Sequence, residues 1–178
     1  MFRINFMACC VFSVLLCASF CNAADRTVED ARGNSIVLQA TESPDFFHYA
    51  NERFGFAVDV PAMYTLALVI PDNGDGIILT DANKETQFRA SGGNIIEKRS
   101  LKQRYDADRK TLGKNLAYSH LGKNFYILSW VEDSMIHYRK YILAPSVYCD
   151  MEFTYPAARK KEFDVPVTHS ARSLSLEE

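Results

Sequence analysis

The chain of 178 residues carries 20 Lys and Arg residues against 22 Asp and Glu residues, which gives a formal net charge of −2. So mild a charge argues against an electrostatic grip on nucleic acid or on an anionic lipid surface. The length is that of a single domain, and twelve Phe and nine Tyr supply the large side chains of an ordinary hydrophobic core.

Residues 1–24 have the pattern of a secretory signal peptide. A basic start leads into an apolar run at 6–20, and small residues at Ala23 and Ala24 precede an abrupt change to charged residues. The run is shorter than the ~20 apolar residues of a membrane-spanning helix, which disfavours an uncleaved anchor. A lipoprotein attached at Cys21 is a further alternative, disfavoured because a bulky residue precedes that cysteine. We therefore predict cleavage near Ala23 or Ala24 and a periplasmic or secreted protein.

Cleavage after Ala24 leaves 154 of the 178 residues, without a membrane span. The removed segment holds one charged residue, Arg3, so the formal net charge changes from −2 to −3. Four of the five cysteines also lie in it, and the remaining Cys149 has no partner for an intramolecular disulfide. The mature chain is therefore expected to be held together by its core.

The mature chain is predicted to begin with an N-terminal arm, residues 25–45, in front of a single domain at 46–175. The arm lacks sustained periodicity except for a short strand pattern at 35–40. Within the domain, apolar residues alternate with small or polar ones over 54–60, which predicts a half-buried strand that ends at Pro61.

Three further strands are predicted before the first helix, at 64–70, 77–81 and 86–91. The segment "PDNGDG" (71–76) is typical of a turn. It lacks the ligand spacing of a calcium-binding loop, so we do not expect a calcium site there.

An amphipathic helix is predicted over 100–112. Ser100 and Gln103 match a capping box at its start, and Gly113 is a natural end. A second capping-box pattern begins at Asn94 and is a competing start. Opposite charges four residues apart indicate that the charged side of this helix faces solvent.

Strands are then predicted at 124–131, 135–143 and 147–155, followed by a C-terminal helix that is broken or kinked at Pro166. Position 142 is expected to pair with 147 across the turn between the last two strands. The pairs on the polar side are then Arg139–Asp150, His137–Glu152 and Tyr141–Tyr148. A slip by one residue would bury charge against apolar groups, which sheets strongly resist.

The strand at 124–131 is joined to the next by "EDS" (132–134), with position 131 opposite either 134 or 136. Both pairings put Tyr126, Leu128 and Trp130 on the same face as His137 and Arg139. The candidate partner-binding residues on this face are Tyr126, Trp130, His137, Arg139, Tyr141, Tyr148, Asp150 and Glu152. Aromatic and Arg side chains with a charged margin are typical of protein interfaces. The alternative is that a helix or the arm simply covers the face.

No catalytic, metal-binding or cofactor-binding motif is found. The four histidines are scattered without the spacing of metal ligands: His48, His120, His137 and His169. Ser119 and His120 are neighbours in a predicted strand and face opposite sides, so they form no catalytic dyad. Cys149 falls on the apolar side and is expected to be a buried, unreactive thiol. Lys140 falls on the same side and must extend its charge to an edge.

The order of several segments resembles a group of bacterial secreted proteins with the PsbP-like fold, which includes the DcrB-like proteins. The segments are "YANERFGFAVDVPA", "NGDG", the helix, "SWVEDSMIHYRKY" and "MEFTYP", within residues 46–175. The resemblance implies an α+β fold, an α/β/α sandwich with a mainly antiparallel sheet flanked by helices. It also implies a role in binding, as an assembly factor, adaptor or chaperone, and it carries over no catalytic residue. Pro166 and the segment 25–45 depart from a minimal member.

The sequence thus favours a non-enzymatic protein that binds a protein partner through its aromatic sheet face or a sheet edge, as an adaptor, chaperone or immunity protein. A carrier of a small apolar ligand, held between sheet and helix, is the first alternative. A hydrolase that uses His137 with Glu152 is the second.

Overall fold

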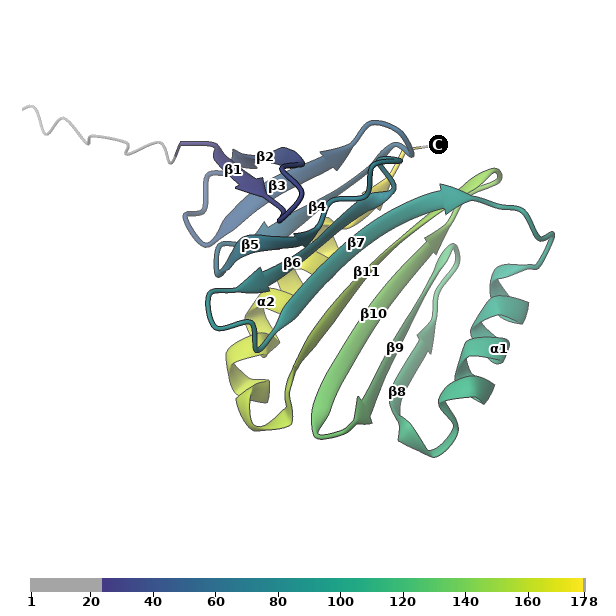
Figure 1. The fold of residues 1–178 in the computed structure, drawn as a ribbon. Helices are drawn as coiled ribbons and strands as arrows, with labels where there is room; N and C mark the ends of the chain where they lie inside the picture. Colours follow the sequence, from purple (N-terminus) through teal and green to yellow (C-terminus); the bar gives the residue numbers. More distant parts are fainter. Residues whose placement is uncertain (1–23, 178) are drawn as a thin grey trace, which may run out of the picture.

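The computed structural model describes residues 24–177, which form two antiparallel sheets and two α-helices (Figure 1). The seven-stranded sheet has the order β5 (Tyr64–Val69), β6 (Gly76–Asp81), β7 (Gln87–Asn94), β11 (Val147–Pro156), β10 (Met135–Leu143), β9 (Phe125–Glu132) and β8 (Leu116–Leu121). The five-stranded sheet has the order β1 (Arg26–Glu29), β2 (Ser35–Ala40), β3 (Phe46–Asn51), β4 (Phe56–Pro61) and β12 (Ser175–Leu176). The predicted signal peptide lies outside the described residues, apart from Ala24.

Helix α1 (Leu101–Leu112) has the predicted ends. The Ser100 hydroxyl accepts a hydrogen bond from the backbone N–H of Gln103, whose side chain accepts one from the backbone N–H of Ser100. The competing start at Asn94 is not used, because that residue ends β7. Gly113 follows the helix with φ 51°, a conformation that glycine adopts without strain.

Helix α2 (Lys160–Ser173) continues through Pro166, so of the predicted break or kink the break is wrong. Proline in a helix removes the hydrogen bond to the carbonyl four residues earlier, here that of Glu162. Glu162 is exposed in the first turn, where water can solvate that carbonyl. Short 3-10 turns, Gly113–Asn115 and Ala157–Arg159, complete the regular structure.

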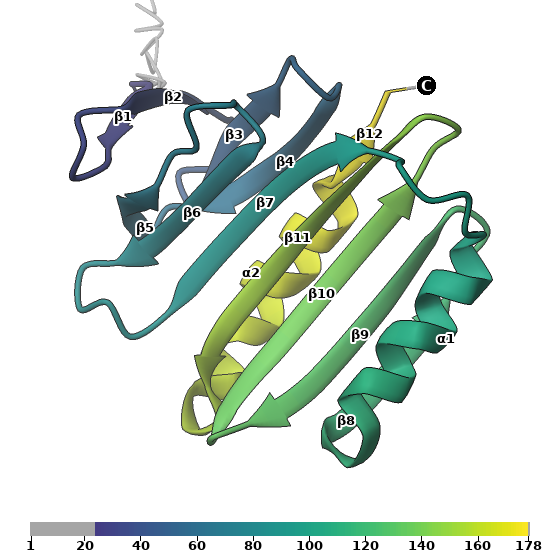
Figure 2. The same ribbon diagram turned by 45° about the vertical axis from the view of Figure 1, so that its right-hand side comes forward.

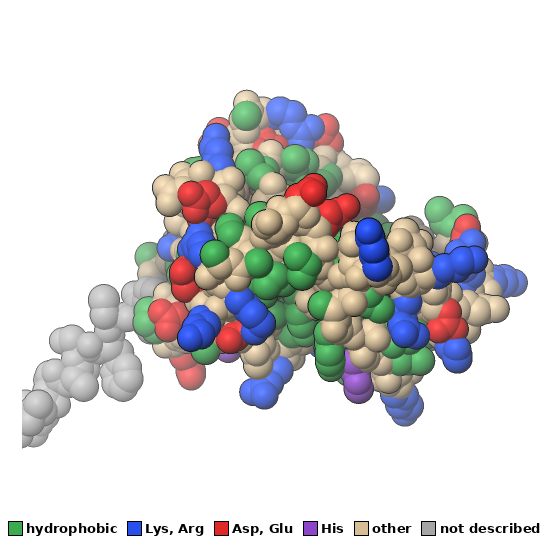
Figure 3. All heavy atoms as spheres, turned by 90° about the horizontal axis from the view of Figure 1, so that it is seen from below, with side chains coloured by type: hydrophobic (Ala, Val, Ile, Leu, Met, Phe, Trp, Pro, Cys, Tyr) green, Lys and Arg blue, Asp and Glu red, His purple; other side chains and the backbone are tan. Residues whose placement is uncertain are grey.

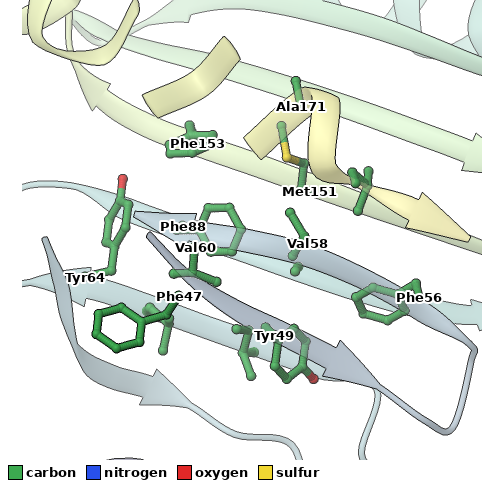
Figure 4. Close-up of a cluster of buried hydrophobic side chains, with 14 of the residues drawn as sticks. Phe47, Tyr49, Phe56, Val58, Val60, Tyr64, Phe88, Met151, Phe153 and Ala171 are labelled. Carbon is green, nitrogen blue, oxygen red and sulfur yellow. The ribbon is translucent and has the colours of Figure 1, made fainter. Parts of the chain in front are cut away.

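The two helices lie on opposite faces of the seven-stranded sheet (Figure 2). On one face, α1 contacts β8 and β9; on the other, α2 contacts β10, β11 and β4, so the five-stranded sheet and α2 share a side. The main core fills the space between the seven-stranded sheet and the layer formed by the five-stranded sheet and α2. There, Phe88, Met151 and Phe153 face Val58 and Val60 (Figure 4). The predicted antiparallel sheet flanked by helices is confirmed, and the second sheet is an addition that the sequence did not reveal.

The segment predicted as an N-terminal arm is built into the fold as the hairpin β1–β2. Val28 and Leu38 belong to the same core as the rest of the domain, with exposures of 3% and 0%. The Asp30 carboxylate accepts hydrogen bonds from the backbone N–H groups of Asn34 and Ile70, which ties the hairpin to the end of β5. The short strand predicted at 35–40 is confirmed as β2, whereas β1 carried too few residues for a pattern.

The pairing of β10 with β11 differs from the prediction by two residues. Ile142 lies opposite Cys149, so Arg139 lies directly opposite Glu152. The connecting turn lies further along the chain than predicted, because the backbone N–H of Ala144 donates a hydrogen bond to the Val147 carbonyl. A shift of two keeps every side chain on its predicted face, because side chains alternate with a period of two. Alternation therefore determines on which face of the sheet each side chain of β10 and β11 lies, and the geometry of the turn determines which residue lies opposite it.

The pairing of β9 with β10 follows one of the two predicted alternatives. Val131 lies opposite Ile136, and the connecting residues Asp133 and Ser134 have φ values of 48° and 65°. Two consecutive positive φ angles are typical of the type I′ turns that join tightly paired strands.

Within residues 24–177, no helix has the length and apolar character needed to cross a membrane.

Candidate functional site

All eight candidate residues lie on the sheet face that α1 partly covers. Their positions follow rows that run across β7, β11, β10 and β9. The rows are Gln87–Thr154–His137–Trp130, Arg89–Glu152–Arg139–Leu128 and Ser91–Asp150–Tyr141–Tyr126. Tyr148 lies beyond the last row, opposite Gly93. We call this surface the α1-side face.

Helix α1 buries one part of this face. Tyr105 of the helix packs on Tyr126, Tyr141 and Leu128 in a separate small core. Tyr126, Tyr141 and Tyr148 are stacked in a line, with ring centroids 5.0 Å and 5.2 Å apart. The alternative that a helix covers the face therefore holds for Tyr126 and Tyr141, which are 1% and 3% exposed.

A buried carboxylate lies at the centre of the α1-side face. Asp150 is 1% exposed and accepts hydrogen bonds from Arg139 Nε at 2.6 Å, Arg89 Nη2 at 2.8 Å and the Ser91 hydroxyl at 2.7 Å. Burial by itself raises the pKa of Asp150, but the guanidinium groups of Arg139 and Arg89 outweigh it and hold the pKa below its usual range. Asp150 is therefore an ionised anchor that fixes two arginine side chains.

The predicted cross-strand pairs Arg139–Asp150 and His137–Glu152 are in contact, although diagonally rather than directly across the ladder. Arg139 contacts Asp150, and His137 Nδ1 lies 3.2 Å from Glu152 Oε1. Glu152 also accepts a hydrogen bond from Arg89 at 3.2 Å. The diagonal contacts arise because the strands are shifted by two residues while long side chains still reach the next row.

The same network fastens α1 to the sheet. Asp108 of the helix accepts a hydrogen bond from the Tyr126 hydroxyl at 2.5 Å and lies 3.6 Å from Arg139 Nη1. Arg139 thus connects the buried Asp150 to the helix, and its side chain is only 27% exposed.

The remaining part of the face, around Trp130, is only partly covered by α1: Trp130 is half-buried and packs against the edge of the small core, where the last turns of α1 line a cavity beside it. The Trp130 ring stacks on His137 with centroids 4.7 Å apart and planes within 6°. Both Glu152 and the Thr154 hydroxyl lie 3.2 Å from the same nitrogen, His137 Nδ1. A catalytic relay needs the acid and the nucleophile on different ring nitrogens, so this arrangement does not support the hydrolase alternative.

The sequence did not identify Arg89 and Ser91 on β7 or Asp108 on α1. Arg89 and Asp150 are 61 residues apart, and no local pattern indicates that β7 pairs with β11. The predicted strand at 86–91 contains Arg89 and Ser91, and the two-residue period of a strand is the signal that puts them on one face. That Asp150 shares their face follows only from the sheet order.

Two histidines that are far apart in the sequence meet at one carboxylate on the other side of the molecule. His48 Nδ1 lies 3.0 Å from Asp59 Oδ1, and His169 Nε2 lies 2.8 Å from Asp59 Oδ2. The spacing of the histidines in the sequence did not indicate that this pair meets in space. Residues 24–177 nevertheless contain no group of three or more His, Cys, Asp or Glu side chains placed to hold a metal ion.

Cys149 and Lys140 behave as predicted on the α2 side of the sheet. Cys149 is completely buried, and burial raises the pKa of its thiol to about 12, which makes it a poor nucleophile. Lys140 extends along the core and donates to the carbonyls of Ala171 and Leu174 at the end of α2. Cations at a helix C-terminus are stabilised by the helix dipole.

Three cavities accompany the sheet. One of about 220 Å³ lies beside Trp130, between the last turns of α1 and the sheet, and one of about 200 Å³ lies between the first turns of α1 and the stacked tyrosines. The third, of about 440 Å³, is on the opposite face between α2 and strands β8–β10.

Comparison with solved structures supports the fold. The solution structure of cyanobacterial PsbP (CyanoP) from Synechocystis sp. PCC 6803 matches with a TM-score of 0.56 and 9% sequence identity, over 76% of this chain and 94% of that one. Neither a protein-family model nor a curated protein matches the sequence. The chain therefore has the PsbP-like α+β fold that the sequence predicted.

Proposed function

We propose that this protein is a non-enzymatic binding protein that engages a protein partner through the part of the α1-side face that α1 leaves partly exposed, centred on Trp130. The observation that supports it best is the surface left beside α1. There, the Trp130 ring stacks on His137, and Arg139 and Glu152 line the cavity beside it. A periplasmic or secreted location is part of the proposal and rests on the signal-peptide pattern of residues 1–24.

The fixed positions of these side chains favour recognition. Ordering a flexible side chain at an interface costs ~0.5–1.5 kcal/mol, which weakens binding. Arg89 and Arg139 are already held by Asp150, and His137 is held by Glu152, so a partner meets a preordered surface. Trp and Arg are also the residue types that dominate binding energy at protein interfaces.

The buried candidates contribute indirectly. Tyr126, Tyr141 and Asp150 have almost no exposed surface, so we assign them to supporting the face rather than to touching a partner. Trp130, His137, Arg139 and Glu152 are each partly exposed and are proposed to make contact.

Replacing Trp130 by alanine tests the proposal. The partner is first identified by native mass spectrometry of the protein extracted gently from its own organism, and is then purified. We expect Trp130→Ala to weaken its binding by about 2 kcal/mol or more, roughly thirtyfold in Kd, because a central aromatic side chain is lost. Isothermal titration calorimetry measures the Kd, and circular dichroism checks that the variant is folded.

Val131→Ala is the matched control. Val131 is the next residue on β9, points to the opposite face and is 41% exposed, so its replacement should leave the Kd unchanged. Equal binding by Trp130→Ala and the wild-type protein would contradict the proposal, as would an effect of Val131→Ala as large as that of Trp130→Ala.

A carrier of a small apolar ligand is a second candidate, because the 440 Å³ cavity between α2 and β8–β10 has the size of ligand-binding sites. Its apolar lining includes Ala117, Tyr118, Val131, Ile136, Tyr138, Tyr155 and Val167. Figure 3 views the end of the molecule where the β9–β10 turn and the start of α2 lie, and shows hydrophobic side chains exposed between charged ones.

An uncharged dye, Nile red, tests this candidate. If the cavity holds apolar ligands, Ala117→Phe should lower the affinity for the dye about tenfold or more, because the added ring occupies the cavity. Ala158→Phe makes the same change at an exposed position outside the lining and should have no effect. Fluorescence titration gives both affinities, and identical values for the two variants would exclude this cavity.

A further inference from the structure

The cavity between the first turns of α1 and the stacked tyrosines is rich in positive charge. It measures about 200 Å³, and its lining includes three guanidinium groups, Arg99, Arg104 and Arg139, but a single carboxylate, Asp108. Tyr141 and Tyr148 form the sheet side of the cavity. It is separate from the cavity beside Trp130, although Asp108 and Arg139 lie between the two and line both.

Two buried polar atoms at this cavity lack a hydrogen-bond partner. They are the Tyr141 hydroxyl and Arg104 Nε, and the described residues contain only one other such side-chain atom. Burial raises the pKa of Tyr141 to about 12, so its hydroxyl stays protonated and can donate. Burying a donor without an acceptor costs ~1–3 kcal/mol, and native proteins rarely leave one so.

The ion pairs around the cavity leave Arg104 without a counterion. Arg99 pairs with Glu97 at 2.8 Å, and Arg139 pairs with Asp150 at 2.6 Å. Arg104 donates one hydrogen bond, from Nη2 to the Glu97 carbonyl, and has no carboxylate within 4.0 Å among residues 24–177. The positive charge of Arg104 is therefore unbalanced at a cavity where the Tyr141 hydroxyl and Arg104 Nε both lack a hydrogen-bond acceptor.

We propose that this cavity binds a small oxyanion, a carboxylate or a phosphate group, between Arg104 and Tyr141. An oxyanion supplies acceptors that can satisfy both donors at once, and its charge balances that of Arg104. Hydrogen bonds between ionised groups and donors are about twice as strong as those between neutral groups, and guanidinium groups match the geometry of both anions. This site does not depend on the protein-partner proposal, because Trp130 does not line the cavity.

Titration with inorganic phosphate and, separately, with acetate tests the site. Both titrations are made at constant ionic strength with chloride as the replaced anion, and are followed by isothermal titration calorimetry and by NMR of the arginine side-chain N–H groups. We expect saturable binding that shifts the Arg104 Nε–H signal. Tighter binding of phosphate would support a phosphate ligand, and tighter binding of acetate would support a carboxylate.

Three variants locate the binding. Arg104→Gln should weaken it roughly tenfold or more, because the unpaired charge is lost. Lys110→Gln removes the same charge from an exposed position of α1 and should change the affinity little. Tyr141→Phe should weaken binding while raising the melting temperature of the anion-free protein, since it deletes an unsatisfied buried hydroxyl.

Two outcomes would overturn the proposal. One is the absence of saturable binding of either anion to the wild-type protein. The other is an unchanged affinity in a folded Arg104→Gln variant, which would place any bound anion elsewhere. Neither outcome affects the effect expected for Trp130→Ala.

Discussion

Replacing Asp150 by alanine is expected to lower the free energy of unfolding by about 3–5 kcal/mol, the range found when one partner of a buried ion pair is removed. The loss is large because Arg89 and Arg139 would remain partly buried without their counterion, and the Ser91 hydroxyl would lose its acceptor. Urea denaturation followed by circular dichroism measures the change. A loss below about 1 kcal/mol would show that the network does not anchor the face.

Asp106→Ala is the control for Asp150→Ala. Asp106 pairs with Lys102 on the surface of α1, where both side chains are largely exposed, and exposed pairs contribute ~0–1 kcal/mol. Its replacement should therefore leave the stability almost unchanged.

The effect of Asp150→Ala should also depend on pH. The pKa of Asp150 in the folded protein is depressed, so its stabilising contribution is complete above the unfolded-state value of about 3.9 and is lost as the pH falls towards the folded-state value. The difference in stability between the wild-type protein and the variant should thus shrink below about pH 4. A difference that stays constant down to acid pH would contradict the assignment of Asp150 as an ionised anchor.

Leu38→Ala is expected to cost about 2–5 kcal/mol, because Leu38 is completely buried in the shared core. A loss of this size would show that residues 25–45 are an integral part of the fold rather than an arm. Val37, its neighbour on β2, is 55% exposed, so Val37→Ala should change the stability by less than about 0.5 kcal/mol. If the two variants were equally stable, the hairpin β1–β2 would not contribute to the core in solution.

The sequence predicted the features that depend on local patterns. Alternation in "RFGFAVDV" and in "MIHYRKYIL" identified β4 and β10, and the capping box at Ser100 located the start of α1. Alternation also placed His137, Arg139 and Glu152 on one face correctly.

The features that it could not predict depend on distant contacts. The two-residue shift between β10 and β11 keeps the same pattern of buried residues, so hydrophobicity alone does not distinguish it. The pairing of Arg89 with Asp150, and the meeting of His48 and His169 at Asp59, require the order of strands in two sheets. β1 is four residues long, too short for its alternation to stand out.

The structure also divides the candidate face into parts with different roles. Tyr126, Tyr141 and Asp150 are buried beneath α1, whereas the residues in the row from Gln87 to Trp130 are exposed or half-buried. A single sequence pattern therefore encoded both a packing surface and a candidate interface. Residue type alone did not separate them, because the boundary is set by where α1 lies.

Site-specific photocrosslinking is the most direct test of partner binding. A photoreactive benzoylphenylalanine is placed at Gln87, which is exposed on the α1-side face, and in a second variant at Val131, on the opposite face. Both variants are expressed in the organism of origin and irradiated, and the products are identified by mass spectrometry. We predict one stoichiometric protein crosslinked from position 87, absent from position 131, and lost when Trp130→Ala is combined with the probe. The account would be contradicted if position 87 gave no crosslinked protein, or if both positions and the Trp130→Ala combination gave the same products.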